Sequence, residues 1–150
     1  LVAPLPHLPV IKDLVVEMET FYQRFEEIKP YLIRGTPLPE KELLQSPKDR
    51  RLLDEVTDCI WCGACSASCP IVRQGQSYLG PAALVKAYRF AVDTRDEGGK
   101  ERLKPFDREE GAWRCHTVFN CVEVCPKKIN QVRAIQSLKR KGIFGRLKLW

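Results

Sequence analysis

Seven cysteines, gathered in two short runs, constrain this chain of 150 residues more than any other feature. In the first run, Cys59, Cys62, Cys65 and Cys69 are separated by two, two and three residues, and Pro70 follows. In iron–sulfur proteins with this run, three thiolates bind one cluster and the fourth binds the other cluster. Pro70 turns the chain, so that Cys69 points away from the first three cysteines. The run therefore predicts two clusters.

The second run follows the same template with one change. Its members Cys115, Cys121 and Cys125-Pro126 match the first, third and fourth positions, but Val118 stands where the second cysteine is expected. Crossing of the fourth cysteines predicts Cys59, Cys62, Cys65 and Cys125 for a [4Fe–4S] cluster, and Cys69, Cys115 and Cys121 for the other cluster. Because Val118 cannot bind a fourth iron, we expect the second cluster to be a [3Fe–4S] cluster.

Other uses of these cysteines are less consistent with the spacing. Structural zinc takes four ligands per ion, and the cysteines together with His116 could form two such sites. Zinc, however, needs neither the repeated spacing nor the two trailing prolines. An odd number of cysteines argues against a complete disulfide framework. A pair of [4Fe–4S] clusters is the remaining alternative, with His116 or a group from outside the chain as the eighth ligand.

Composition excludes several other classes of protein. Apolar residues make up 44% of the chain and charged residues 29%, so it is not a disordered tail. The longest apolar runs fall far short of the roughly 18 residues that a membrane span needs. The net charge is +6, but aromatic and basic residues are not interleaved in a patch, so we expect no nucleic-acid partner. The first residue is Leu1, which predicts processing, trimming or a longer parent chain.

A basic and apolar stretch lies near the C-terminus. It comprises Lys139, Arg140, Lys141, Arg146 and Lys148 with Ile143, Phe144, Leu147 and Trp150. Such a stretch fits docking against a membrane partner or an anionic lipid surface. An ordinary solvated helix end is the alternative.

Helical signals dominate the rest of the chain. Apolar residues recur at helical spacing over 18–28, Ser46-Pro47 and Gly80-Pro81 each open a helix, and Asn130 begins a final helix that Gly142 ends. Residues 1–17 are predicted to form an extended lead-in, in which 10–16 is a strand without a partner strand in the chain. We therefore predict an all-α domain over 18–150, with the cysteine loops between helices.

With these motifs in place, the chain resembles the C-terminal, cluster-bearing domain of the iron–sulfur subunit of succinate dehydrogenase (respiratory complex II). The matching stretches are residues 9–14, 59–69, 80–90, 93–96 and 113–126. The resemblance implies an α-helical ferredoxin fold and an electron-transfer subunit without a substrate-oxidising site of its own. In that family, electrons pass from a FAD-bearing subunit through a [2Fe–2S], the [4Fe–4S] and the [3Fe–4S] cluster to quinone at the membrane anchor.

The resemblance also implies partners and a location. Residues 10–16 would be the last strand of the [2Fe–2S] ferredoxin domain, which is either missing from this chain or a separate polypeptide. The FAD flavoprotein and the membrane-anchor subunits would be the other partners. The subunit would be peripheral on the inner face of a bacterial cytoplasmic membrane or of the mitochondrial inner membrane. A fumarate reductase subunit, or an iron–sulfur subunit of another redox complex, is the alternative.

Three residues match the quinone site of the family, namely Pro70, His116 and Lys139. His116 is equally a candidate hydrogen-bond donor beside the ligand Cys115, and Lys139 is equally an ordinary basic helix residue. Gln74 stands where many members carry a quinone-proximal tryptophan. This departure bears on the type of quinone and on its packing.

Overall fold

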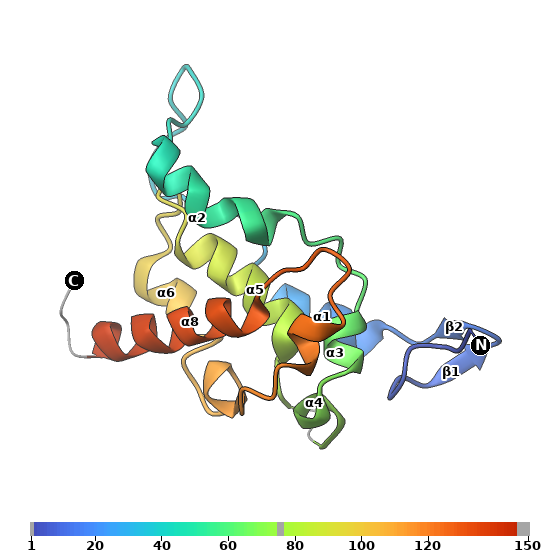
Figure 1. The fold of residues 1–150 in the computed structure, drawn as a ribbon. Helices are drawn as coiled ribbons and strands as arrows, with labels where there is room; N and C mark the ends of the chain where they lie inside the picture. The colour runs from blue at the N-terminus through green and yellow to red at the C-terminus, as the bar shows by residue number, and fades with distance from the viewer. Residues whose placement is uncertain (1, 75–76, 147–150) are drawn as a thin grey trace.

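Helices α5 (Gly80–Ala91) and α8 (Gln131–Arg146) lie side by side at the centre of the molecule and share its most extensive contact (Figure 1). The computed structural model describes residues 2–74 and 77–146. The other helical segments are α1 (Glu19–Glu27), α2 (Pro47–Thr57), α3 (Ala64–Ala67), α4 (Pro70–Gln74), α6 (Gly99–Leu103), the 3-10 helix η1 (Ala112–Arg114) and α7 (Asn120–Glu123). In the described ranges, no helix is long and apolar enough to cross a membrane.

The core has two parts, and each part adjoins a different set of cysteines. The larger part joins α5 to α8 through Leu84 and Leu138, both 0% exposed, and Cys69 and Cys115 pack against it. The smaller part is formed by Val56, Val85, Ile129 and Ala134, and Cys59 and Cys125 pack against it. Burial of these apolar side chains therefore holds the cysteine loops against α5 and α8.

Three predicted helix starts are confirmed, since α5 begins at Gly80 and two other helices begin with the expected caps. Ser46 caps α2, because its hydroxyl oxygen accepts the backbone N–H of Asp49 at 3.1 Å. Asn130 caps α8 in the same way, since its side-chain oxygen accepts the N–H of Arg133 at 2.8 Å. Both caps satisfy an N–H group that has no partner within its helix.

The predicted end of the last helix is wrong. Helix α8 continues through Gly142 to Arg146. Gly142 is buried, and a Cβ atom at this position would lie 2.5 Å from Oδ1 of Asp107. The glycine therefore allows close packing inside the helix and does not end it. Of the basic and apolar C-terminal stretch, Ile143 and Phe144 are exposed, whereas residues 147–150 lie outside the described part of the chain.

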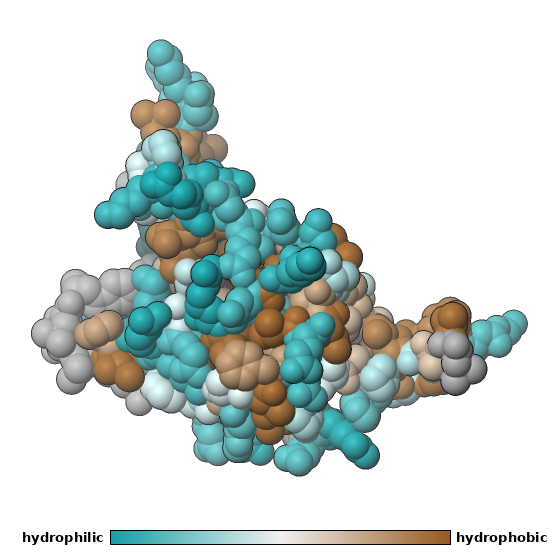
Figure 2. Space-filling view, viewed as in Figure 1, coloured by the Kyte–Doolittle hydropathy of each residue, from teal (hydrophilic) through white to brown (hydrophobic). Residues whose placement is uncertain are grey.

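The prediction of a strand without a partner is also wrong. Strands β1 (Val10–Lys12) and β2 (Val15–Val16) pair with each other as an antiparallel hairpin, with Val10 opposite Val16. The chain reverses at Asp13, whose φ of 51° lies in the left-handed region. The structure is thus mostly helical with a small two-stranded sheet, rather than all-α. The hairpin projects from the helices, and Figure 2 shows apolar surface on it.

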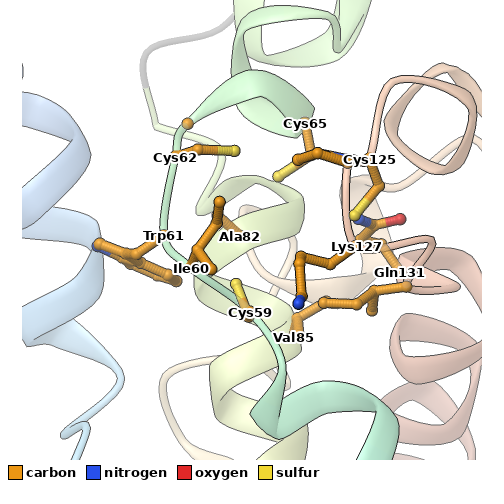
Figure 3. A pocket seen from close by; sticks show the side chains of 13 residues that line it. Cys59, Ile60, Trp61, Cys62, Cys65, Ala82, Val85, Cys125, Lys127 and Gln131 are labelled. Atoms are coloured by element: carbon orange, nitrogen blue, oxygen red, sulfur yellow. The ribbon is translucent and has the colours of Figure 1, made fainter.

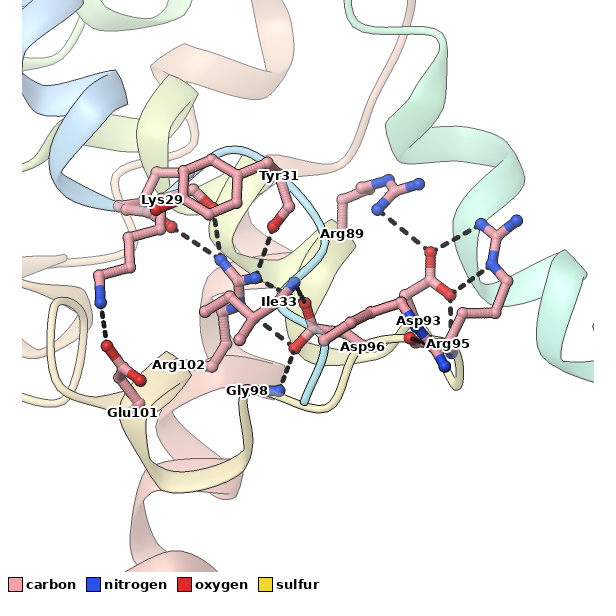
Figure 4. Close-up of polar contacts among 12 residues, drawn as sticks. Lys29, Tyr31, Ile33, Arg89, Asp93, Arg95, Asp96, Gly98, Glu101 and Arg102 are labelled. Atoms are coloured by element: carbon pink, nitrogen blue, oxygen red, sulfur yellow. Dashed lines mark hydrogen bonds and ion pairs between the residues drawn. The ribbon is translucent and has the colours of Figure 1, made fainter. Parts of the chain in front are cut away.

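A buried ion pair ties the loops on one side of α5 together (Figure 4). The side chains of Arg102 and Asp96 are 2% and 4% exposed, and Nη2 of Arg102 lies 2.5 Å from Oδ2 of Asp96. Arg102 also donates to the carbonyl oxygens of Ile28 at 3.1 Å and Tyr31 at 2.6 Å, just after α1 ends. Arg102 thereby joins the segment after α1 to the loop that carries Asp96.

Candidate iron–sulfur site

The two cysteine loops adopt the same backbone conformation. In the first loop Trp61 and Gly63 have φ angles of 60° and 79°, and in the second loop Thr117 and Phe119 have φ angles of 59° and 69°. All four residues lie in the left-handed region, which residues other than glycine rarely adopt. The second left-handed residue of each loop also caps a short helix, α3 or α7. The two loops therefore repeat the same pattern of left-handed residues followed by a short helix.

Because of this repeat, Val118 in the second loop corresponds in position to Cys62 in the first loop. Cys62 stands between Trp61 and Gly63, and Val118 stands between Thr117 and Phe119. Both residues are exposed within their loops, and each lines a hollow. Val118 therefore lies where the template has a thiol.

The first hollow has a volume of about 400 Å³, part of it open to solvent. Four thiols line it: those of Cys59, Cys62, Cys65 and Cys125. Figure 3 shows their sulfur atoms pointing toward one space, three from the first loop and one from the segment after α7. Most of the other lining groups are apolar, including Ile60, Ala82, Val85 and Ile129. The predicted first ligand set is thus brought together in three dimensions.

The second hollow has a volume of about 330 Å³, part of it open to solvent, and lies beside the second loop. Three thiols line it: those of Cys69, Cys115 and Cys121. Val118 lines the same hollow, together with apolar side chains such as Ile135. All seven cysteines are free of disulfide bonds and divide between the two hollows as four and three. This is the division that the crossing of the fourth cysteines predicts.

Burial and crowding favour the protonated form of two of these thiols, those of Cys65 and Cys121. Burial, followed by the neighbouring Cys59 and Cys121, raises the pKa of the Cys65 thiol to about 12. Burial, followed by Cys69 and Cys115, raises the pKa of the Cys121 thiol to about 11. Iron would supply the positive charge that holds such groups as thiolates. Helix α3, which carries Cys65, contacts helix α7, which carries Cys121, so the two hollows lie next to each other.

The donor set fits iron–sulfur clusters, which are held by cysteine thiolates in apolar surroundings. Among the described residues, no three His, Cys, Asp or Glu side chains lie close enough together to hold a single metal ion. The thiols instead surround hollows that adjoin the two parts of the core.

The residues predicted to meet quinone are only partly brought together. Pro70 and His116 line the second hollow, and His116 is exposed. Lys139 does not line it. Its Nζ donates to the carbonyl oxygen of Cys115 at 3.0 Å and lies 5.9 Å from the ring centroid of Trp113. Lys139 therefore contacts the backbone of a predicted ligand and does not face the hollow. Gln74 is exposed at the end of α4.

Two polar residues of the site give no signal in the sequence. Tyr78 is 1% exposed and lines the second hollow, where its hydroxyl group is hydrogen-bonded to Cys115. Burial, followed by the neighbouring Cys115 and Cys69, raises its pKa, so the hydroxyl group stays protonated and can donate. Gln131 is 3% exposed and lines the first hollow. Only the packing of α5 and α8 brings these side chains to the cysteines.

Comparison with known families bears on this arrangement. The profile of a family described as "4Fe-4S dicluster domain" matches residues 55–129, which include all seven cysteines. The chain belongs to the 4Fe-4S dicluster domain family. Within this dicluster family, the identity of each cluster depends on the ligands that the individual chain supplies.

Relatives of this dicluster chain include succinate dehydrogenase iron–sulfur subunits. The chain is 47% identical over 137 residues to the succinate dehydrogenase iron–sulfur subunit of Paracoccus denitrificans. The match covers 91% of this chain and 53% of the relative. It is 43% identical over 139 residues to that of Coxiella burnetii, covering 92% and 59%. It is 44% identical over 143 residues to the mitochondrial succinate dehydrogenase [ubiquinone] iron–sulfur subunit of Candida glabrata, covering 94% and 56%. The chain thus spans a little over half the length of these relatives.

A solved structure shares the fold. It is a chain of the Mycobacterium smegmatis Sdh1 complex in the apo form, with a TM-score of 0.80 and 23% sequence identity. The match covers 93% of this chain and 59% of that chain. The helical framework around the two hollows is therefore a known one.

Proposed function

We propose that the chain is the cluster-bearing part of a succinate dehydrogenase iron–sulfur subunit and carries electrons between two partners. The observation that carries the proposal is the division of seven thiols between two adjoining hollows. Similarity to succinate dehydrogenase iron–sulfur subunits at 43–47% identity supports the choice of enzyme. Two clusters bound by crossed ligands lie close together, which suits electron relay rather than substrate chemistry.

The first hollow would bind a [4Fe–4S] cluster through Cys59, Cys62, Cys65 and Cys125. The second would bind a [3Fe–4S] cluster through Cys69, Cys115 and Cys121. The repeat of the loop backbone supports this difference, because Val118 takes the place of Cys62 and offers no thiolate. When bound, the clusters supply one-electron chemistry. The chain itself holds the thiolates in place, surrounds them with apolar side chains and fixes the distance between the clusters.

In the complete enzyme, electrons would enter from a FAD flavoprotein through a [2Fe–2S] domain and leave to quinone at a membrane anchor. The domain boundary would fall near residue 17, with the projecting hairpin as the end of the [2Fe–2S] half and residues 18–150 as the helical domain. Exposed apolar side chains on the hairpin, such as Ile11 at 66% exposed, support docking against that half. The subunit would be peripheral on the inner face of the membrane.

Quinone would approach the second hollow, where Pro70 and His116 lie together. His116 is exposed and beside Cys115, so a bound quinone could accept a hydrogen bond from it close to the second cluster. Lys139 would act through its bond to the Cys115 carbonyl. Substitution of His116 by Ala is expected to lower the rate of quinone reduction without loss of either cluster. An unchanged rate would exclude this role.

Electron paramagnetic resonance (EPR) of the anaerobically purified complex tests the cluster assignment. We expect a [3Fe–4S] signal in the oxidised protein, a [4Fe–4S] signal after reduction and about seven irons bound to this chain. About eight irons without a signal in the oxidised state would mean that another group completes the second cluster. Bound zinc in a colourless protein would overturn the proposed function.

A further inference from the structure

Gln131, the first residue of α8, carries a polar group that has no partner among the described residues. The residue is 3% exposed, and its Oε1 atom is buried without a hydrogen bond. It lines the hollow that also contains the four thiols of the first ligand set. In Figure 3, Cys125, Lys127 and Gln131 lie on the same side of this hollow. A buried polar atom without a partner is costly and needs an explanation.

The position of Gln131 is fixed by contacts on both sides of it in the chain. The backbone N–H of Asn130 donates to Oε1 of Glu55 at 2.5 Å, and Arg133 forms an ion pair with the same carboxylate. Asn130 also caps α8 through the N–H of Arg133 at 2.8 Å. These contacts hold the first turn of α8 against α2. The side chain of Gln131 therefore faces the hollow and not solvent.

The thiolates and sulfides expected in the hollow favour a hydrogen-bond donor at the position of the carboxamide. Thiolates and the sulfides of a cluster accept hydrogen bonds and do not donate them. A carbonyl oxygen beside them would be repelled, whereas the Nε2 group of the same carboxamide carries two N–H donors. Rotation of the amide by half a turn exchanges the two atoms without moving the rest of the side chain. Beside a cluster, the favourable orientation is therefore the one in which the N–H groups face the sulfur atoms.

We propose that the carboxamide of Gln131 donates an N–H hydrogen bond to a sulfur atom of the cluster in the first hollow and raises its reduction potential. A donor to sulfur stabilises the additional negative charge of the reduced cluster. The inference rests on the proposed function, because it requires a cluster held by Cys59, Cys62, Cys65 and Cys125. Gln131 is thus a positioning and tuning residue of the first cluster and not a ligand.

The test is an EPR-monitored redox titration of the complete complex with Gln131→Leu, which removes both donors and keeps a similar volume. We expect the reduction equilibrium of the first cluster to move toward the oxidised form by up to about tenfold, or about 59 mV for one electron. The matched control is Gln136→Leu on the same helix. Its amide donates to Thr117 of the second loop at 3.0 Å, so the first potential should not move.

A second measurement does not depend on the stability of a variant. Wild-type protein labelled with ¹⁵N only in the glutamine side-chain amide should show a ¹⁵N coupling in the reduced first cluster, because Gln131 is the one glutamine that lines this hollow within the described residues. A missing coupling, or an unchanged potential in Gln131→Leu at full cluster occupancy, would overturn the inference alone. A wild-type complex without a [4Fe–4S] signal would overturn the proposed function together with it.

Discussion

Val118 occupies in the second loop the place that Cys62 occupies in the first, between two residues with left-handed backbone. The flanking φ angles are 60° and 79° around Cys62, and 59° and 69° around Val118. The backbone that presents a ligand is therefore present in both loops, and only the side chain differs. A valine is thus present in the second loop without a change in the left-handed residues around it.

Because the backbone is in place, Val118→Cys is expected to complete a four-thiol site in the second hollow. The oxidised protein should lose the [3Fe–4S] signal that we propose for the wild type, and the iron content of the chain should rise from about seven to about eight. EPR and iron analysis of the purified complex measure both changes. Retention of the three-iron signal at full strength would contradict the placement of Val118.

The matched control for this substitution is Val124→Cys. Val124 is 43% exposed, similar to the 49% of Val118, but it lines neither hollow. An additional thiol at this position should leave the iron content and the EPR signal unchanged. Iron gained by both variants would mean that an exposed thiol near the loops is sufficient by itself.

Tyr78→Phe should change the second cluster and spare the first. The hydroxyl group of Tyr78 is buried and hydrogen-bonded to Cys115, so its loss removes a donor to a proposed ligand of the second cluster. We expect the reduction potential of that cluster to fall by about 30 to 60 mV, with unchanged occupancy, in an EPR-monitored titration. Tyr88 is half-buried and lines neither hollow, so Tyr88→Phe should move neither potential.

The sequence was most informative where local spacing decides the structure. Spacing of the cysteines predicted which thiols meet at each hollow, because three of the four thiols in the first set come from one loop. The helix starts at Ser46 and Asn130 were equally predictable, since a cap depends on groups three residues apart. In each case the deciding contact is local.

The structure departs from the expectations where distant segments approach each other. Gly142 carries a helix-stop signal, but the close approach of Asp107 explains the glycine and α8 continues. Gln131 looks like a polar first-turn residue and is in fact buried at the first hollow. The hairpin was missed because its two strands are very short and lie within one β-branched run. None of these outcomes can be inferred from neighbouring residues alone.

Arg102→Met is expected to destabilise the fold strongly without removing a predicted cluster ligand. It leaves the buried carboxylate of Asp96 without its cation and the carbonyls after α1 without their donor. Removal of one partner of such a pair costs about 3 to 5 kcal/mol. Urea unfolding followed by circular dichroism measures this loss. The exposed pair of Arg50 and Asp54 offers the control, because Arg50→Met should cost only about 0.5 kcal/mol.

Asp93 gives the domain a defined pH dependence. Burial alone would raise the pKa of its carboxyl group, but the hydrogen bonds from Arg95 and the charge of Arg89 together lower it below the ordinary value. A carboxyl group with a lowered pKa in the folded state contributes stability above its unfolded pKa of about 3.9 and loses it as pH falls through the folded pKa. Stability should therefore decline on acidification below about pH 4.

The variant Asp93→Asn separates this contribution from other acid effects. At pH 7 it should be less stable than the wild type by about 3 kcal/mol, because two arginines lose the carboxylate between them, at 2.8 Å and 3.1 Å. Below about pH 4 the difference should shrink, since the wild-type carboxyl group also becomes neutral. Urea midpoints of both proteins from pH 7 to pH 3 measure the convergence. Parallel curves at all pH values would show that Asp93 stabilises the loop by packing and not by charge.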